Sequence, residues 1–204
     1  MILLTGFEPF GGESTNPSWS AAREAAARLR AEGLEVQAVE LPCVFGDAVR
    51  ALEAALEQYH PDLVICAGQA GGRSRVSLER IAINCDDARI PDNAGNAPVD
   101  QPVVAGGPAA YFSTLPVKAA LADLLAAGIP AEVSQTAGTY VCNHVFYSAC
   151  HFLAPLPVGL IHVPYAPAQT IARPGTPAMA IEGTIEAIRI AAAVAIASLP
   201  PEGA

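Results

Sequence analysis

The sequence predicts an α/β fold built on a largely parallel sheet. Short apolar runs alternate with amphipathic stretches in the order strand, helix, strand, helix, strand up to Ala67. The last of these runs, DLVICA (Asp62 to Ala67), is almost entirely apolar, which is typical of a central parallel strand covered on both faces. At 204 residues the chain is long enough to bury a substantial core, so we expect one domain over residues 1–204, with 200–204 as a frayed tail.

The elements of the first half follow from local patterns. Ile2 to Thr5 is an apolar run that predicts a buried strand. Ser18 is the expected N-cap of a helix from Trp19 to Ala31, and Gly33 ends that helix. Two further elements complete this half, a strand over Glu35 to Leu41 and a helix over Gly46 to Tyr59.

The second half opens with a strand-like apolar segment from Val76 to Asn84. It runs into CDDARIPDNAGNAPVDQP, and a loop this long inside a domain is usually functional or interfacial. The remaining expected elements are a helix over Leu115 to Ala127 ended by Gly128, a strand over Ala131 to Gln135, a helix over Cys142 to Phe152, a strand over Val158 to Val163, and a final helix over Pro177 to Leu199.

Two glycine-rich loops follow predicted strands. GFEPFGGESTNP comes after the first strand and carries Phe7 and Phe10, while GQAGGRS (Gly68 to Ser74) comes directly after the strand that ends at Ala67. Neither GxGxxG nor GKS/GKT is present, which disfavours a nucleotide site. Because ligands of open α/β sheets bind outside the carboxyl ends of the strands, we expect both loops to border a binding site.

Charge and hydropathy limit the partners. The formal net charge of −9, with no run of Lys or Arg, argues against a nucleic-acid partner. Charged residues interrupt the first half of Ile181 to Leu199, so we expect this segment to be a packed helix, with no membrane association. Hydrophobic residues make up 52% of the chain, more than one small domain readily hides, which predicts a homo-oligomer.

Cysteine usage points to the cytoplasm. Five cysteines form an odd set without CxxC pairs, and the start MILLTGFEPF lacks the features of a secretory signal. We therefore expect a reducing, cytoplasmic environment.

Cys142 is the candidate nucleophile. It stands where a Gly-containing turn is expected to become a helix, and the positive end of the helix dipole favours a thiolate and lowers the thiol pKa. The N–H groups of Asn143 and His144 in the first turn are candidates for stabilising an oxyanion. The alternative is that Cys142 is a small buried apolar residue.

A nucleophilic cysteine needs a base, and a third group that orients the base. His144 is two residues from Cys142, about 200° around the helix, so its ring is expected to point elsewhere. His151 is at least two turns away, and His60 precedes Pro61 at a helix end. His162 remains, near the carboxyl end of GLIHVP, although it also suits a core position.

The orienting acid stays open among Glu79, Asp86, Asp87 and Asp92. Glu79 lies in an apolar strand-like segment, where a lone carboxylate is costly to bury without a partner. The three aspartates lie in a polar loop that suits solvated or capping roles. A metal site built from Cys142, His144, Cys150 and His151 is not expected, because Cys142 and Cys150 are roughly 12 Å apart along a helix.

Six ordered blocks resemble pyroglutamyl peptidase I, a cysteine peptidase family also called pyrrolidone carboxyl peptidase. They cover nearly the whole chain and are TGFEPFGG with Asn16-Pro17, GQAGGRSRVSLERIAIN, ARIPDNAGNAPVD, GGPAAYFSTLP, TAGTYVCNHVFY and GLIHVPY. The resemblance implies a three-layer α/β/α sandwich with a twisted mixed, mostly parallel sheet of the phosphorylase/hydrolase type. It also implies a cytoplasmic enzyme that needs no metal or other cofactor and often forms tetramers.

By the same resemblance, Cys142 is the nucleophile, His162 the base and then acid, and Glu79 the carboxylate that orients His162. The implied substrates are peptides and proteins that begin with pyroglutamate, a neutral lactam. The resemblance also assigns the pocket: apolar walls from Phe7, Phe10, Tyr140 and Val141, lactam contacts from the backbone around Gln69, support of the loop by Asn16, and Arg89 near the oxyanion. An ion pair of Arg89 with Asp86 or Asp92 is an alternative.

One segment departs from the family pattern: FLAPLPV, between the Cys142 helix and the His162 strand, is shorter than in several relatives, which bears on assembly. Cys85 matches no catalytic position and is interpreted as packing. Two other functions compete, a nucleoside phosphorylase-like enzyme on a similar scaffold and a non-catalytic pyroglutamate-binding module.

Overall fold

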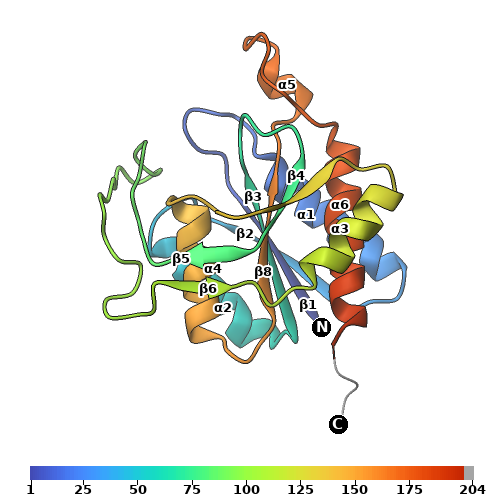
Figure 1. Ribbon diagram of the computed structural model, residues 1–204, viewed down its shortest axis with the longest axis horizontal. Helices are drawn as coiled ribbons and strands as arrows, with labels where there is room; N and C mark the ends of the chain where they lie inside the picture. The colour runs from blue at the N-terminus through green and yellow to red at the C-terminus, as the bar shows by residue number, and fades with distance from the viewer. Residues whose placement is uncertain (200–204) are drawn as a thin grey trace.

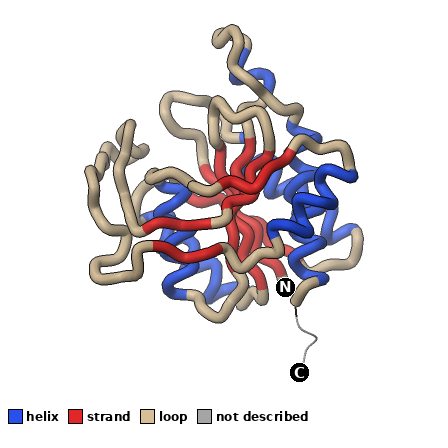
Figure 2. Tube along the Cα trace, viewed as in Figure 1, coloured by secondary structure: helices blue, strands red, loops and turns tan. Residues whose placement is uncertain are grey.

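Six strands form the central sheet of the computed structural model, which describes residues 1–199 (Figures 1 and 2). The tail expected to fray, 200–204, lies outside the described residues. The strands are β1 (Ile2–Phe7), β2 (Val36–Leu41), β3 (Leu63–Gln69), β4 (Val76–Glu79), β7 (Ala131–Ser134) and β8 (Val158–Val163). Their order in the sheet is β2-β1-β3-β8-β4-β7. In this order β2, β1, β3 and β8 are mutually parallel, whereas β4 pairs antiparallel with β8 and parallel with β7. The predicted mixed, mostly parallel sheet is therefore confirmed.

Helices cover both faces of this sheet, which gives the predicted three layers (Figure 1). One face carries α1 (Pro17–Ala31), α3 (Val117–Ala126) and α6 (Ile181–Ala197), and the other carries α2 (Asp47–Tyr59) and α4 (Val141–Phe152). Alternate residues of a strand point to opposite faces, so Ile65 of β3 joins the first core, while Val64 and Cys66 join the second. Central strands buried in this way explain the continuous apolar run that marked β3.

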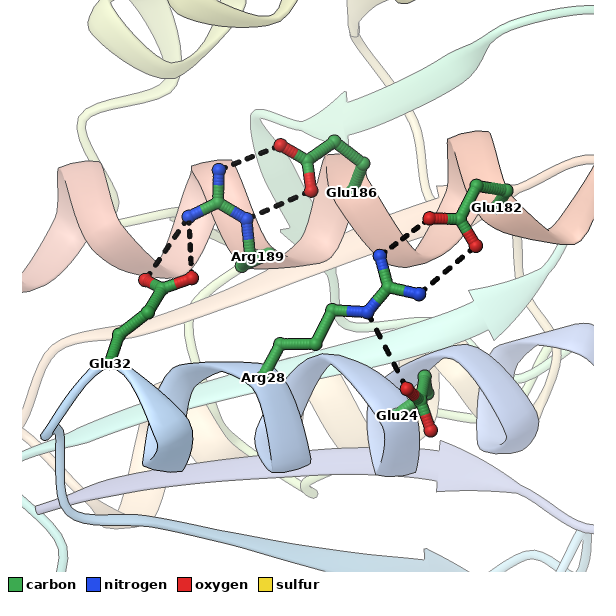
Figure 3. A network of polar contacts seen from close by, with 6 residues as sticks. All are labelled: Glu24, Arg28, Glu32, Glu182, Glu186 and Arg189. Atoms are coloured by element: carbon green, nitrogen blue, oxygen red, sulfur yellow. Dashed lines mark hydrogen bonds and ion pairs between the residues drawn. The ribbon is translucent and has the colours of Figure 1, made fainter.

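The α1–α6 pair is packed through alanines and bordered by charges. Buried alanines of both helices allow close approach, and an ion-pair network runs along the exposed edge (Figure 3). The Arg28 guanidinium donates to both carboxylate oxygens of Glu182 at 2.6 and 3.0 Å, and Arg189 binds Glu186 and Glu32. Such exposed pairs add little stability, so apolar burial dominates this contact. Within residues 1–199, no helix has both the length and the apolarity to cross a bilayer.

The start of α1 corrects the expected cap. Asn16, not Ser18, is the N-cap: its Oδ1 accepts hydrogen bonds from Ser18 N at 3.0 Å and Ser18 Oγ at 2.8 Å. Pro17 then occupies the first turn, where its missing N–H costs nothing. The Ser18 hydroxyl instead accepts from Phe7 N at 3.1 Å and so ties α1 to the end of β1.

The final helix begins at Ile181 rather than at Pro177. Residues before it pair with the segment that follows β8, through a bridge between Tyr165 and Ala178 and a hydrogen bond from Met179 N to Tyr165 O at 2.9 Å. A short helix that the sequence pattern did not predict, α5 (Pro167–Thr170), lies in the same connection and stands above the sheet in Figure 1. The expected strand-like segment Val76 to Asn84 is divided at Arg80 into two strands, β4 and β5 (Ile81–Ile83), which belong to different sheets. The other predicted helices and strands are present, with ends shifted by a few residues.

The long polar segment is a structured excursion. β5 (Ile81–Ile83) and β6 (Ala110–Phe112) form a separate antiparallel pair beside α4, and the segment between them loops out. Asp92 organises this loop by accepting from the backbone N–H groups of Phe45, Ala94 and Asn96, the capping role expected of it. The Asn143 side chain binds the backbone of Ile83, which fixes β5 to the start of α4.

Candidate active site

Three neighbouring strands bring a histidine and a glutamate together on one face of the sheet. His162 of β8 is aligned with Gly68 of β3 on one side and with Ser77 of β4 on the other. Glu79 lies two residues beyond Ser77 and therefore shares its face. Diagonal neighbours across antiparallel strands are within reach of long side chains, and His162 Nδ1 lies 2.7 Å from Glu79 Oε1.

The Glu79 carboxyl group is fully buried and ionised. Burial raises its pKa, but the hydrogen bond and charge of His162, followed by the nearby Ser134 hydroxyl and the charge of Arg73, outweigh this and lower the pKa overall. A carboxylate only accepts hydrogen bonds, so the proton between the two groups resides on His162 Nδ1. In the neutral ring, Nε2 is therefore the unprotonated nitrogen.

Cys142 meets that nitrogen above Gly68. Cys142 is the second residue of α4, and its sulfur lies beside Gly68 near the carboxyl end of β3. A Cβ atom added to Gly68 would lie 2.7 Å from Cys142 Sγ and 3.1 Å from His162 Nε2. Sulfur and nitrogen thus face the same small space, which is open only because residue 68 has no side chain.

The expected low pKa of Cys142 is wrong in this structure. Burial raises the pKa of the Cys142 thiol well above its ordinary value, and nearby Cys43, Cys66 and Glu79 add to the effect. The helix N-terminus does not compensate, because the cost of placing a negative charge in an apolar core is larger than the dipole contribution. The resting group is therefore a thiol, and forming the thiolate requires a base.

The first turn of α4 offers fewer free N–H groups than expected. His144 N donates to Tyr140 O at 3.0 Å and is not available to an oxyanion, which corrects that assignment. The N–H groups of Cys142 and Asn143 have no backbone or side-chain oxygen partner within residues 1–199. The His144 ring points away from Cys142, as expected: Nδ1 lies 2.7 Å from Asp86 Oδ2, and Nε2 accepts from Gly46 N.

A cavity of about 380 Å³ opens in front of Cys142 and His162. Of the residues assigned to binding, its lining includes Phe7, Phe10, Asn16, Gln69, Arg89 and Tyr140. Val141 is not part of the lining: as the first residue of α4 it turns inward and is fully buried in the core beneath the helix. Its assignment as a pocket wall is therefore wrong.

The cavity walls are held by specific contacts. The ring centroids of Phe10 and Tyr140 are 5.9 Å apart, and the Tyr140 hydroxyl donates to Pro91 O at 3.0 Å. Asn16 Nδ2 donates to Glu8 O at 3.0 Å, so this side chain ties the loop after β1 to the start of α1. Gln69 Oε1 accepts from Gln169 Nε2 at 2.9 Å, which connects α5 to the rim of the cavity.

Arg89 is exposed and makes no hydrogen bond or ion pair within residues 1–199. The alternative pairing with Asp86 or Asp92 does not occur, because Asp86 binds His144 and Asp92 caps its own loop. Its guanidinium lies at the cavity wall and is free to interact with a bound group.

Several cavity residues were not found from the sequence, among them Arg73, Cys43, Ile90 and Tyr165. Arg73 had a local signal, since it lies in the glycine-rich loop after β3 and six residues before Glu79. The other three have no sequence pattern that distinguishes them from packing residues. Among residues 1–199, no three His, Cys, Asp or Glu side chains converge on a point that could hold a metal ion.

Known proteins match this chain over nearly its whole length. The family model described as pyroglutamyl peptidase matches residues 1–198. The pyrrolidone-carboxylate peptidases of Erwinia tasmaniensis and Klebsiella pneumoniae are 54% and 56% identical over 198 residues, which are 96% of this chain and 92% of each relative.

Solved structures agree with these matches. The crystal structure of pyroglutamyl peptidase I from Bacillus amyloliquefaciens is 43% identical, with a TM-score of 0.89 over 96% of both chains. A mutant pyrrolidone carboxyl peptidase from Pyrococcus furiosus is 44% identical, with a TM-score of 0.90 over 98% of this chain and 99% of that one. Neither the phosphorylase-like alternative nor the non-catalytic binding module gains support.

Proposed function

Since the chain belongs to the pyroglutamyl peptidase family, we propose that Cys142, His162 and Glu79 together hydrolyse the amide bond that follows an N-terminal pyroglutamate. The protein is a cysteine-type hydrolase, and the products are 5-oxoproline and the shortened peptide. The observation that carries the residue assignment is the shared space above Gly68, which Cys142 Sγ and His162 Nε2 both border.

The reaction begins with a proton transfer. Because burial keeps Cys142 a thiol, His162 Nε2 takes the thiol proton as the sulfur attacks the pyroglutamyl carbonyl carbon. Glu79 holds the ring through Nδ1 and stabilises the positive charge that the ring acquires. The thiol therefore loses its proton in the same step in which the sulfur attacks the substrate.

The negative charge moves to the carbonyl oxygen. The N–H groups of Cys142 and Asn143 at the start of α4 and the free guanidinium of Arg89 are the donors we assign to it. Collapse of the tetrahedral intermediate breaks the C–N bond, and the leaving amine takes the proton from His162. Water then attacks the thioester with His162 as base, which releases 5-oxoproline and restores the thiol.

The cavity suits an uncharged five-membered ring. Phe7, Phe10 and Tyr140 provide flat apolar walls, and burying such a ring against them requires no counter-ion. The lactam N–H and C=O still need partners, since an unpaired buried polar group costs about 1 to 3 kcal/mol. We assign these contacts to the backbone around Gln69, with Asn16 holding the loop after β1 in place.

Assembly and location belong to the same proposal. Phe112 and Phe152, 70% and 58% exposed, are large apolar side chains that a homo-oligomer would cover, and the family resemblance favours a tetramer. All five cysteines are free, which suits a cytoplasmic protein. Light scattering on the purified protein measures the subunit number, and a monomer at micromolar concentration would contradict the assembly proposal.

The residue assignment is tested with a fluorogenic pyroglutamyl amide. We expect Cys142→Ala to release no amine above background and Cys150→Ala, a change in the same helix outside the cavity, to keep wild-type turnover. His162→Ala should be as inactive as Cys142→Ala, because both remove the thiol–imidazole pair. Full turnover by Cys142→Ala would overturn the assignment.

A further inference from the structure

Arg73 lines the cavity and also contacts Glu79. Its side chain, 28% exposed, extends from the loop after β3 toward the fully buried Glu79. Its Nη1 donates to Glu79 Oε1 at 2.6 Å, and its Nη2 donates to Thr136 O at 3.1 Å. Building on the function proposed above, we propose that Arg73 is a positioning residue that fixes the Glu79 carboxylate and, with it, the imidazole of His162.

The geometry around Glu79 supports this role. Oε1 accepts from both His162 and Arg73, whereas Oε2 is buried without a hydrogen-bond partner within residues 1–199. Only one carboxylate oxygen is therefore anchored. Without Arg73, only the His162 imidazole would hold Glu79 Oε1. The carboxylate could then rotate, and a rotating carboxylate does not fix the orientation of the imidazole.

The second contact extends the effect to the nucleophile. Thr136 begins the turn that leads into α4, so the guanidinium connects the strand of Glu79 to the segment that places Cys142. A planar guanidinium can serve both acceptors at once because its N–H groups have fixed directions. One side chain thereby sets the relative position of the strand and the helix that carry the reacting groups.

Arg73 also changes the electrostatics of the pair. Burial raises the pKa of Glu79, whereas His162, then the Ser134 hydroxyl and then the charge of Arg73 lower it. A cation beside the carboxylate compensates part of the negative charge that Glu79 places next to the His162 ring. The other titratable groups around the pair are Cys142 from α4 and Cys66 from β3, with Asp87 and Arg89 in the cavity wall.

The test compares Arg73→Met and Arg73→Lys with a matched control. Arg75→Met removes an exposed arginine two residues away that makes no hydrogen bond or ion pair within residues 1–199. We expect Arg73→Met to lower kcat/KM by about 100-fold, as a displacement near 1 Å in a catalytic group does. Arg73→Lys keeps the charge but lacks the planar guanidinium that donates to two acceptors at once. Its kcat/KM should therefore fall between those of Arg73→Met and the wild type.

The pH profile separates positioning from simple loss of structure. Removing the cation leaves the Glu79 charge less compensated, so we expect the acid limb of kcat/KM to move to higher pH. Arg73→Lys should keep the wild-type limb, and Arg75→Met should match wild type in both rate and limb. The rate of iodoacetamide alkylation at Cys142, corrected with Cys142→Ala, should shift in the same direction without any substrate.

Two results would overturn the inference: Arg73→Met with kcat/KM within about twofold of Arg75→Met, or a folded Arg73→Met with an unchanged acid limb. If Arg73→Met does not fold, Arg73→Lys decides, and a wild-type rate there would reject the bridging role. An inactive wild-type protein would refute the proposed function instead, and in that case the alkylation profile still reports on Arg73.

Discussion

Replacing Gly68 with alanine is the smallest change that enters the space between sulfur and imidazole. Gly68 of β3 is aligned with His162 of β8. The φ angle of Gly68 is not in the left-handed region, so the backbone accepts alanine without strain. The added methyl group would lie 2.7 Å from Cys142 Sγ, 3.0 Å from His162 Cδ2 and 3.1 Å from His162 Nε2. All three contacts are with the side chains that we assign to the reaction.

The magnitude follows from these distances. Ordinary contact requires about 3.5 to 4.0 Å, so the sulfur must move by about 1 Å away from the methyl group. A displacement of that size in a reacting group costs about 100-fold in rate. The cost in stability is about 1 to 3 kcal/mol for one extra methyl in a packed site, less than the roughly 5 to 15 kcal/mol of a typical domain, so the variant should remain folded.

The assay compares kcat/KM on a pyroglutamyl amide with the midpoint of thermal unfolding. Gly183→Ala is the matched control: Gly183 lies in α6, and an added Cβ there would lie 3.5 Å from Met179, an ordinary contact. We expect Gly183→Ala to keep full activity and Gly68→Ala to lose about 99% of it at a modest cost in unfolding temperature. A folded Gly68→Ala with wild-type kcat/KM would show that the reacting atoms do not meet above residue 68.

Three other changes test separate parts of the structure. The pKa of Glu79 is lowered in the folded state, so its charge stabilises the fold fully above the ordinary value of 4.5 and this contribution is lost as the pH falls through the lowered value. The difference in unfolding free energy between wild type and Glu79→Gln should therefore shrink below about pH 4 in urea titrations; a constant difference would contradict the charged state. Asn16→Ala should lose about 1 kcal/mol of stability, whereas Asn16→Asp keeps the cap acceptor but not the bond to Glu8 O, and equal losses would reject the capping role. Arg28→Met with Arg189→Met should lower the unfolding midpoint at low salt and not at about 1 M NaCl, and a loss that persists in salt would mean that the network acts through packing.

Patterns that depend on neighbours in the chain were readable from the sequence. The apolar run of β3 and the alternation of the first five elements predicted the layered sheet, because burial on both faces leaves a signature in every residue. The carboxyl-edge rule placed the loops, Cys142 and His162 near one another before any coordinates. The cap of α1 was misassigned, since Asn16 and Ser18 are both good capping residues and only the tertiary bond from Phe7 N to Ser18 separates their roles.

Properties that depend on burial were not readable. The helix position of Cys142 suggested a thiolate, yet the core that surrounds the sulfur reverses the direction of its pKa shift. Val141 was assigned to the pocket because it is adjacent to Tyr140, although successive residues at a helix start point in different directions and only Tyr140 borders the cavity. In both cases local sequence fixed the backbone position and the fold decided the environment.

The choice of Glu79 shows most directly what the chain alone conceals. Residues alone left four acids open because the direction of β4 has no sequence signature. In the structure β4 runs antiparallel to β8, with Ser77 opposite His162, so each further residue of β4 lies deeper below the carboxyl edge. Glu79 is therefore placed beneath the imidazole and fully out of water, where it can hold Nδ1 but cannot remain charged unaided. The same strand reversal that brings Glu79 to His162 thus also buries its charge, and Arg73 places a cation beside that charge from the neighbouring loop.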